Sequence, residues 1–268
     1  MFSCGIKAAC GRNFTTPTHM ARLPRLVIPG LPHCLIQRGH GGRPVFVDDG
    51  DRASYLAALR EAAPSCGVQL LAWALLDTQV VLLARPDSAT GLSRMLQAVG
   101  RRYVSAYNRR HRCAGTLWDG RFRCAPVEPG ACVLDLLVWV DGLEFDPVQK
   151  PAHNPANHSA HHSAHAPAHT SAQLRLAGKP DALLTHPPEF WALGNTPFDR
   201  EAAYRRRLAE GASAAQAERW HQAAMGGWVI GSASFVANLA AETARPVRPR
   251  APGRPRKLRP AGDGTPRA

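Results

Sequence analysis

The chain has 268 residues, of which 45% are hydrophobic, enough for one sizeable core with further segments around it. Its formal net charge of +13 predicts an anionic partner, with nucleic acid as the first expectation, and the alternative is a basic protein whose charge serves only solubility. Seven cysteines without a C-x-x-C spacing, and no apolar run of membrane-spanning length, disfavour a disulfide framework, a zinc knuckle and a membrane protein, so a cytoplasmic, nucleoid-associated location is expected.

The N-terminal third alternates short extended segments with one helix. Residues 1–19 lack the apolar region and cleavage site of a signal peptide, so we expect an unstructured leader and translation that starts at Met20. Extended segments are expected at 33–38 and 44–49, on either side of a glycine-rich turn. The segment 51–67 shows a helical apolar face that stops at Pro64 and Gly67.

Two apolar runs, "VQLLAWALL" and "QVVLLARP", follow with only a polar step between them, which predicts a hairpin. Residues 91–111 carry an apolar stripe at helical spacing, the stretch "GTLWDGRFRCAPV" is typical of a turn leading into a strand, and "GACVLDLLVWVDGL" predicts a helix that is apolar on most faces. This order of elements predicts an α+β fold of ferredoxin-like type, an antiparallel sheet with packed helices.

The composition changes after this core, which we place at residues 20–149. Residues 150–180 form a segment rich in His, Ala, Ser and Pro, for which we expect a loop, with a metal site as the alternative. Short helical patterns between 181 and 243 predict a small helical region appended to the core. Residues 244–268 hold too little apolar sequence to build a core, so we expect a disordered basic tail.

Two arginine-rich blocks favour contact with a polyphosphate. The first block supplies candidate phosphate contacts at Arg101, Arg102, Arg109, Arg110, Arg121 and Arg123. Trp118 and Phe122 are candidates for stacking on an unpaired base, and the alternative is that both belong to the core. In the tail, Arg254, Arg256 and Lys257 lie in "PGRPRK", which resembles an AT-hook that inserts arginine into a narrow minor groove.

Three stretches together resemble one family: "MARLPRLVIPGLPHCLIQRG", "GLSRMLQAVGRRYVSAYNRRHRCAGTLWDGRFR" and "FWALGNTPFDREAAYRRRL". They are similar to the REP-associated tyrosine transposases, whose catalytic domain is the insertion-sequence-200-like, single-tyrosine HUH type. The resemblance implies DNA transposition and recombination. In such enzymes two histidines of an N-H-x-H-L-L strand hold a divalent metal, Mg²⁺ or Mn²⁺. A tyrosine in a Y-I-E-x-N-P-V-R helix then attacks the scissile phosphate.

This chain departs from the family at each position that carries the chemistry. "DTQVVLL" occupies the place of the metal strand, so Gln79 and Val81 stand where the histidines would be. A valine has no lone pair, and glutamine offers only a weak neutral oxygen. "GLEFDPVQ" occupies the place of the tyrosine helix, so Gly142 replaces the nucleophile. We therefore expect no intact catalytic residue and no bound metal or other cofactor. A substitute metal site from Glu144, Asp146 and a histidine of residues 153–169 is the alternative, and it would need a nucleophile as well.

Because the enzymatic groups are missing while the arginines remain, the sequence leaves the enzyme question open and favours a DNA-binding protein that has lost strand cleavage. Its expected partner is single-stranded or hairpin-forming repeat DNA. The alternatives are an active transposase that cuts and joins DNA through non-standard residues, and a protein-interaction scaffold. The sequence does not decide between a monomer and a homodimer.

Overall fold

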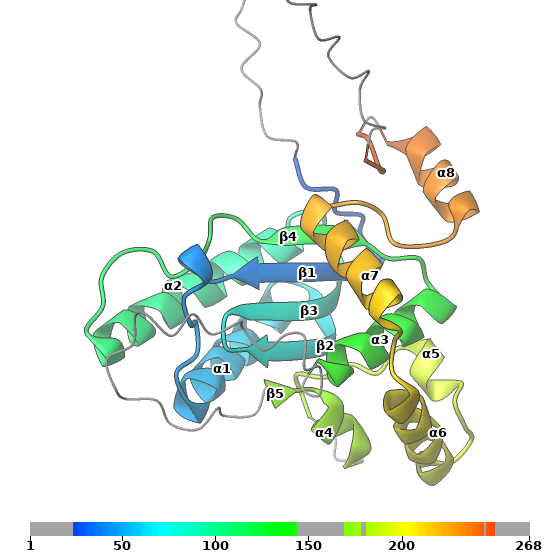
Figure 1. Cartoon of the computed structure of the whole chain (residues 1–268), viewed down its shortest axis with the longest axis horizontal. Helices are drawn as coiled ribbons and strands as arrows, with labels where there is room; N and C mark the ends of the chain where they lie inside the picture. Colours follow the sequence, from blue (N-terminus) through cyan, green and yellow to red (C-terminus); the bar gives the residue numbers. More distant parts are fainter. Residues whose placement is uncertain (1–23, 144–168, 178–180, 244, 250–268) are drawn as a thin grey trace, which may run out of the picture.

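Four antiparallel strands and two long helices form the first half of the fold (Figure 1). The structure, a computed structural model, describes residues 24–143, 169–177, 181–243 and 245–249. Its first elements are β1 (His33–Arg38), the short 3-10 helix η1 (His40–Gly42), α1 (Asp49–Ser65), β2 (Val68–Leu76), β3 (Gln79–Pro86), α2 (Gly91–His111) and β4 (Arg123–Pro126). The strands lie in the order β4-β1-β3-β2, and every pairing is antiparallel. This arrangement confirms the predicted α+β fold.

The hairpin β2–β3 turns at the polar step that the sequence shows. Leu76 pairs with Gln79, so Asp77 and Thr78 form the turn. The carbonyl of Asp77 accepts a hydrogen bond from the amide of Val45 at 2.6 Å, and the carbonyl of Thr78 accepts one from Gly39 at 2.7 Å. The turn is thus held by backbone bonds to the segment after β1, which satisfies polar groups that sit close to the core.

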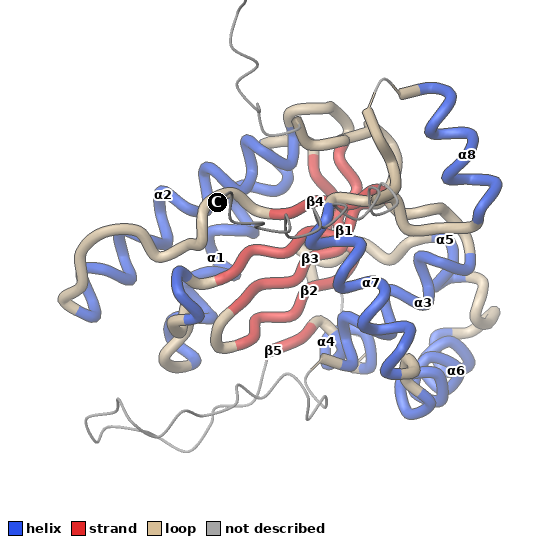
Figure 2. Tube along the Cα trace, turned by 45° about the horizontal axis from the view of Figure 1, so that its top comes forward, coloured by secondary structure: helices blue, strands red, loops and turns tan. Residues whose placement is uncertain are grey.

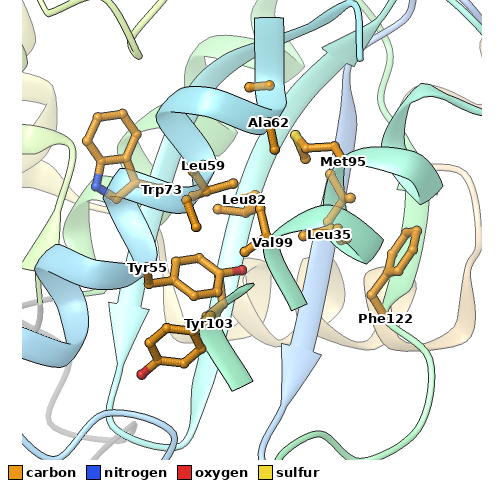
Figure 3. Close-up of a cluster of buried hydrophobic side chains, with 14 of the residues drawn as sticks. Leu35, Tyr55, Leu59, Ala62, Trp73, Leu82, Met95, Val99, Tyr103 and Phe122 are labelled. Atoms are coloured by element: carbon orange, nitrogen blue, oxygen red, sulfur yellow. The ribbon is translucent and has the colours of Figure 1, made fainter. Parts of the chain in front are cut away.

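Side chains alternate along the strands and separate two cores, one on each face of the sheet. On the first face, Leu35 and Leu82 meet the apolar stripes of α1 and α2 (Figure 3). The helix α1 begins after Asp48, whose carboxylate accepts a hydrogen bond from the amide of Asp51, and it ends near Pro64. Tyr55 and Tyr103 pack edge to face within this core, with ring centroids 5.1 Å apart.

The elements that follow β4 are α3 (Ala131–Gly142), β5 (His169–Thr170), α4 (Ala172–Leu176), α5 (Pro188–Trp191), α6 (Pro197–Glu210), α7 (Ala214–Gly226) and α8 (Ala233–Glu242). The helices α3, α5, α6 and α7 supply the apolar layer of the second face, whereas α8 packs in a separate small cluster. The strand β5 pairs with β2 and extends the sheet. Figure 2 shows α3 and α7 on the same side of the sheet: α3 contacts β2 and β3, and α7 contacts β4 and β1. One apolar cluster joins the inner face of this layer to Ile36 and Val81 of the sheet.

A buried polar network fixes this layer to the sheet. Asp141, near the end of α3, accepts hydrogen bonds from the Nε of Arg175 at 3.0 Å, the hydroxyl of Tyr204 at 2.6 Å and the hydroxyl of Ser171. The Nη2 of Arg175 donates to the carbonyl of Leu71 in β2 at 2.6 Å. Both charged side chains are fully buried. Because every member is hydrogen-bonded, the network ties α3, α4 and α6 to the central sheet.

Two expectations about local structure are wrong. Residues 44–49, expected to be extended, form no strand; instead Val45 and Phe46 are buried in the first core, and the hydroxyl of Tyr107 donates to the carbonyl of Pro44. Residues 169–177, expected as part of a loop, form β5 and α4, because β2 offers them a pairing edge that the sequence does not reveal. The remainder of the histidine-rich segment lies outside the described residues.

Among the helices that the structure describes, none combines the length and the apolar character needed to cross a bilayer.

Candidate nucleic-acid interface

The strand that occupies the place of the family's metal-binding strand contributes to a hydrophobic core. Val81 is fully buried and lies between its register partners Ile36 and Ala74, on the face covered by α3. Gln79 lies two residues earlier on the same face, where it is mostly buried. The described residues contain no group of three or more His, Cys, Asp or Glu side chains suited to a metal ion. Glu144 and Asp146, two members of the alternative site, lie outside the described residues.

Gly142, which occupies the place of the tyrosine in the family motif, ends helix α3. Gly142 is half-buried, and a Cβ atom built there would meet only Leu208 of α6, at 3.8 Å. A Cβ atom therefore fits here, and the glycine is not required by crowding at that atom. What the position lacks is a hydroxyl group.

All four tyrosines of the chain are described, and all four are buried. The hydroxyl of Tyr204 donates to Asp141, the residue that precedes Gly142. Burial, followed by the charge of Asp141, holds the pKa of Tyr204 well above the usual range. Burial also raises the pKa of Tyr55 and Tyr103, and it raises that of Tyr107 to about 12. Since a phenolate is the species that attacks a phosphate, burial and raised pKa values disfavour attack by these hydroxyls in this conformation.

The arginines of α2 divide into paired and unpaired side chains. Arg110 forms ion pairs with Asp48 at 2.6 Å and Asp51 at 2.7 Å, so its charge is largely compensated. Arg102 pairs with Glu61, but both side chains are 60% exposed, and such surface pairs are weak. Arg101 and Arg109 are exposed and form no ion pair within the described residues. Of the four predicted contacts on this helix, these two are the best placed for phosphate.

The two aromatic candidates are core residues in this structure. Trp118 is 7% and Phe122 is 8% exposed, and both belong to the first core. The guanidinium of Arg25 also covers the ring of Phe122, 3.7 Å from its centroid. Neither ring offers a free face to a base, so the stacking role predicted for them does not fit this conformation. The aromatic-core alternative does. Arg121 and Arg123, on either side of Phe122, are exposed.

Two exposed aromatic residues escaped the sequence analysis. Trp191 is 50% and Phe198 is 81% exposed, and the guanidinium of Arg200 lies 4.6 Å from the Trp191 ring centroid. Both lie in "FWALGNTPF", where the sequence analysis predicts short helices and names no functional residue. The signal that could have identified them is the proline and glycine content of this stretch, because short helices leave few positions for burial. Arg254, Arg256 and Lys257 of the tail lie outside the described residues.

Comparisons with known proteins concern the fold. The chain is similar in structure to a REP-associated tyrosine transposase bound to a REP hairpin, with 13% identity and a TM-score of 0.40 over 48% of this chain and 73% of that one. It is also similar to a candidate transposase from Deinococcus radiodurans R1, with 23% identity and a TM-score of 0.32 over 40% of this chain and 87% of that one. Neither the models of known protein families nor the curated proteins include a match to this sequence.

Proposed function

We propose that this protein binds DNA, single-stranded or hairpin-forming, and does not cleave it. The absence of cleavage rests on the burial of all four tyrosines, whose pKa values are raised. Transfer of a DNA strand to a tyrosine needs an accessible phenolic oxygen and a means of offsetting charge on the phosphate. Val81, packed inside the second core, offers nothing to a cation.

The proposed binding to DNA rests on the positive charge of the chain. A net charge of +13, with Arg101 and Arg109 exposed on α2 and Arg121 and Arg123 exposed at β4, supports binding to a polyanion. The nearest alternative, a transposase that acts through non-standard residues, would use a tyrosine that becomes exposed or a nucleophile outside the described residues.

A strand-cleavage assay tests the proposal directly. The full chain is incubated with labelled hairpin DNA and Mg²⁺ or Mn²⁺, and both the cleaved strand and a covalent protein–DNA adduct are measured. We expect neither product. Cleavage that Tyr204→Phe abolishes would establish the alternative, because this substitution removes only the hydroxyl that donates to Asp141.

Arginine substitutions on α2 should affect DNA affinity differently, depending on whether an acidic side chain already pairs with the arginine. Arg109→Ala is expected to lower the slope of log affinity against log salt concentration by about 0.7 for single strands, one phosphate contact. Arg110→Ala should lower it less, because Asp48 and Asp51 already neutralise that side chain. Equal effects would contradict this assignment, and a protein without measurable affinity at physiological salt would favour the scaffold alternative.

A further inference from the structure

A bulge between β1 and β4 places arginines beside β1, the strand that pairs with the Gln79 strand on its other side. Ile36 pairs with Arg123, whereas Gly39 pairs with Trp118, so residues 37–38 of β1 face residues 119–122 of the opposing segment. The opposing segment therefore holds two extra residues, and Gly120 within it adopts a φ of +66°. Bulges commonly re-aim side chains. Arg121 within the bulge and Arg123 after it are both exposed.

Arg38 lies on β1, directly opposite the bulged segment, and on the same face of the sheet as Val81. It is the Cα partner of Gln79, just as Ile36 is the partner of Val81, and Ile36 and Val81 both belong to the second core. Because side chains alternate along a strand, Arg38 follows Ile36 onto that face. Arg38 is exposed and ends β1, and that end of β1 lies beyond the helix α7 that crosses the sheet (Figure 1).

The helix α7 borders this place with a histidine. Burial lowers the pKa of His221, Glu218 raises it, and the charge of Arg38 lowers it further. The Nδ1 atom of His221 is buried and has no hydrogen-bond partner within the described residues. Asp119 lies opposite Arg38, and its amide donates a hydrogen bond to the Arg38 carbonyl at 2.8 Å. Neither the carboxylate of Asp119 nor that of Glu218 forms an ion pair with Arg38 in the part of the chain that the structure describes.

Further positive charge gathers on the other side of the bulge. The Nε of Arg25 donates to the carbonyl of Phe122 at 3.1 Å. Burial lowers the pKa of Arg25, and the neighbouring charges of Arg121 and Arg123 lower it further, although Cys124 opposes them. Like charges held together repel one another, and a bound anion relieves that repulsion.

We propose that Arg38, Arg121 and Arg123, here called the basic corner, form a phosphate-binding site in which Arg38 holds a backbone phosphate of single-stranded DNA beside Gln79. This inference deepens the proposed function and rests on it. A guanidinium offers a fixed fork of N–H donors and a permanent charge to phosphate oxygens. A guanidinium therefore binds a phosphate without a metal ion. The end of β1, where Arg38 pairs with Gln79, then holds DNA rather than cuts it.

The test compares variants of the full chain in binding to a single-stranded oligonucleotide over a series of salt concentrations. We expect Arg38→Ala to weaken binding about tenfold at low salt and to lower the salt slope by about 0.7. Arg38→Gln should do the same while it keeps most of the side-chain stem, and Arg38→Lys should retain the slope because it retains the charge. Arg94→Ala is the matched control, since Arg94 is exposed on the first turn of α2 and forms no ion pair with a described residue. It should leave both quantities unchanged.

The outcomes separate this inference from the proposed function. A wild-type chain that does not bind DNA overturns both. Salt-dependent binding by the wild type that Arg38→Ala and Arg38→Gln leave intact overturns only the assignment of Arg38. A chelating agent should have no effect on wild-type binding, and a loss of affinity on chelation would show that a cation, not the guanidinium, holds the phosphate. Because Arg38 is exposed, thermal unfolding of each variant should match the wild type.

Discussion

Arg175→Ala should lower the free energy of unfolding by about 3–5 kcal/mol, the cost of leaving a buried charge without its partner. The fully buried carboxylate of Asp141 would lose the Nε donor at 3.0 Å, and the carbonyl of Leu71 would lose the Nη2 donor at 2.6 Å. The substitution also removes the bond between α4 and the sheet. Denaturant unfolding, with the midpoint and slope measured together, gives this quantity.

The control for this substitution lies on α6. Arg205 forms an ion pair with Glu201, but its side chain is 63% exposed, so Arg205→Ala should cost about 0–1 kcal/mol. Similar losses for the two variants would mean that the Asp141–Arg175 pair does not form in the folded protein. Tyr204→Phe tests the network independently, because the Asp141 carboxylate would lose the hydroxyl at 2.6 Å, a loss of about 1–3 kcal/mol.

Removal of residues 250–268 should weaken binding to duplex DNA at least about tenfold and lower its salt slope by as much as about 5. The segment carries six Lys and Arg residues against one acid, and each phosphate contact contributes about 0.9 to the slope. The truncation keeps Arg245, whose Nη2 donates to the carbonyl of Gly227 at 2.9 Å, so the folded part of the chain should remain intact.

A tail of the same composition in scrambled order serves as the control. It should restore the salt slope, because counterion release depends on charge rather than order. If Arg254 and Arg256 insert into the minor groove, the scrambled tail should lose any preference for A·T-rich duplexes over G·C-rich ones. An unchanged slope after truncation would remove the tail from the DNA-binding surface.

Tertiary contacts decide which of the predicted site residues are exposed and which of their charges are compensated. The exposed Arg101, Arg109, Arg121 and Arg123 are where the pattern suggested, because a helix face or a strand end can be inferred from spacing. The pairing of Arg110 with Asp48 and Asp51 joins residues about 60 positions apart, which no local pattern reveals. The same holds for Arg38, whose proximity to Gln79 depends on strand register.

The sequence alone predicted most of the order of strands and helices in the ferredoxin-like half, because hydrophobic periods of two and 3.6 residues report which side of each element is buried; the extended segment expected at 44–49 is the exception. It also determined that positions 79 and 81 carry no imidazole and that position 142 carries no phenol, since that is a matter of residue identity. Only the tertiary structure decided which polar groups are available. Trp118, Phe122 and the four tyrosines are removed from solvent by elements distant in sequence, and α7 packs on α3 through the contact of the Trp220 ring with Trp139. Burial depends on contacts between distant segments, and local spacing does not contain them.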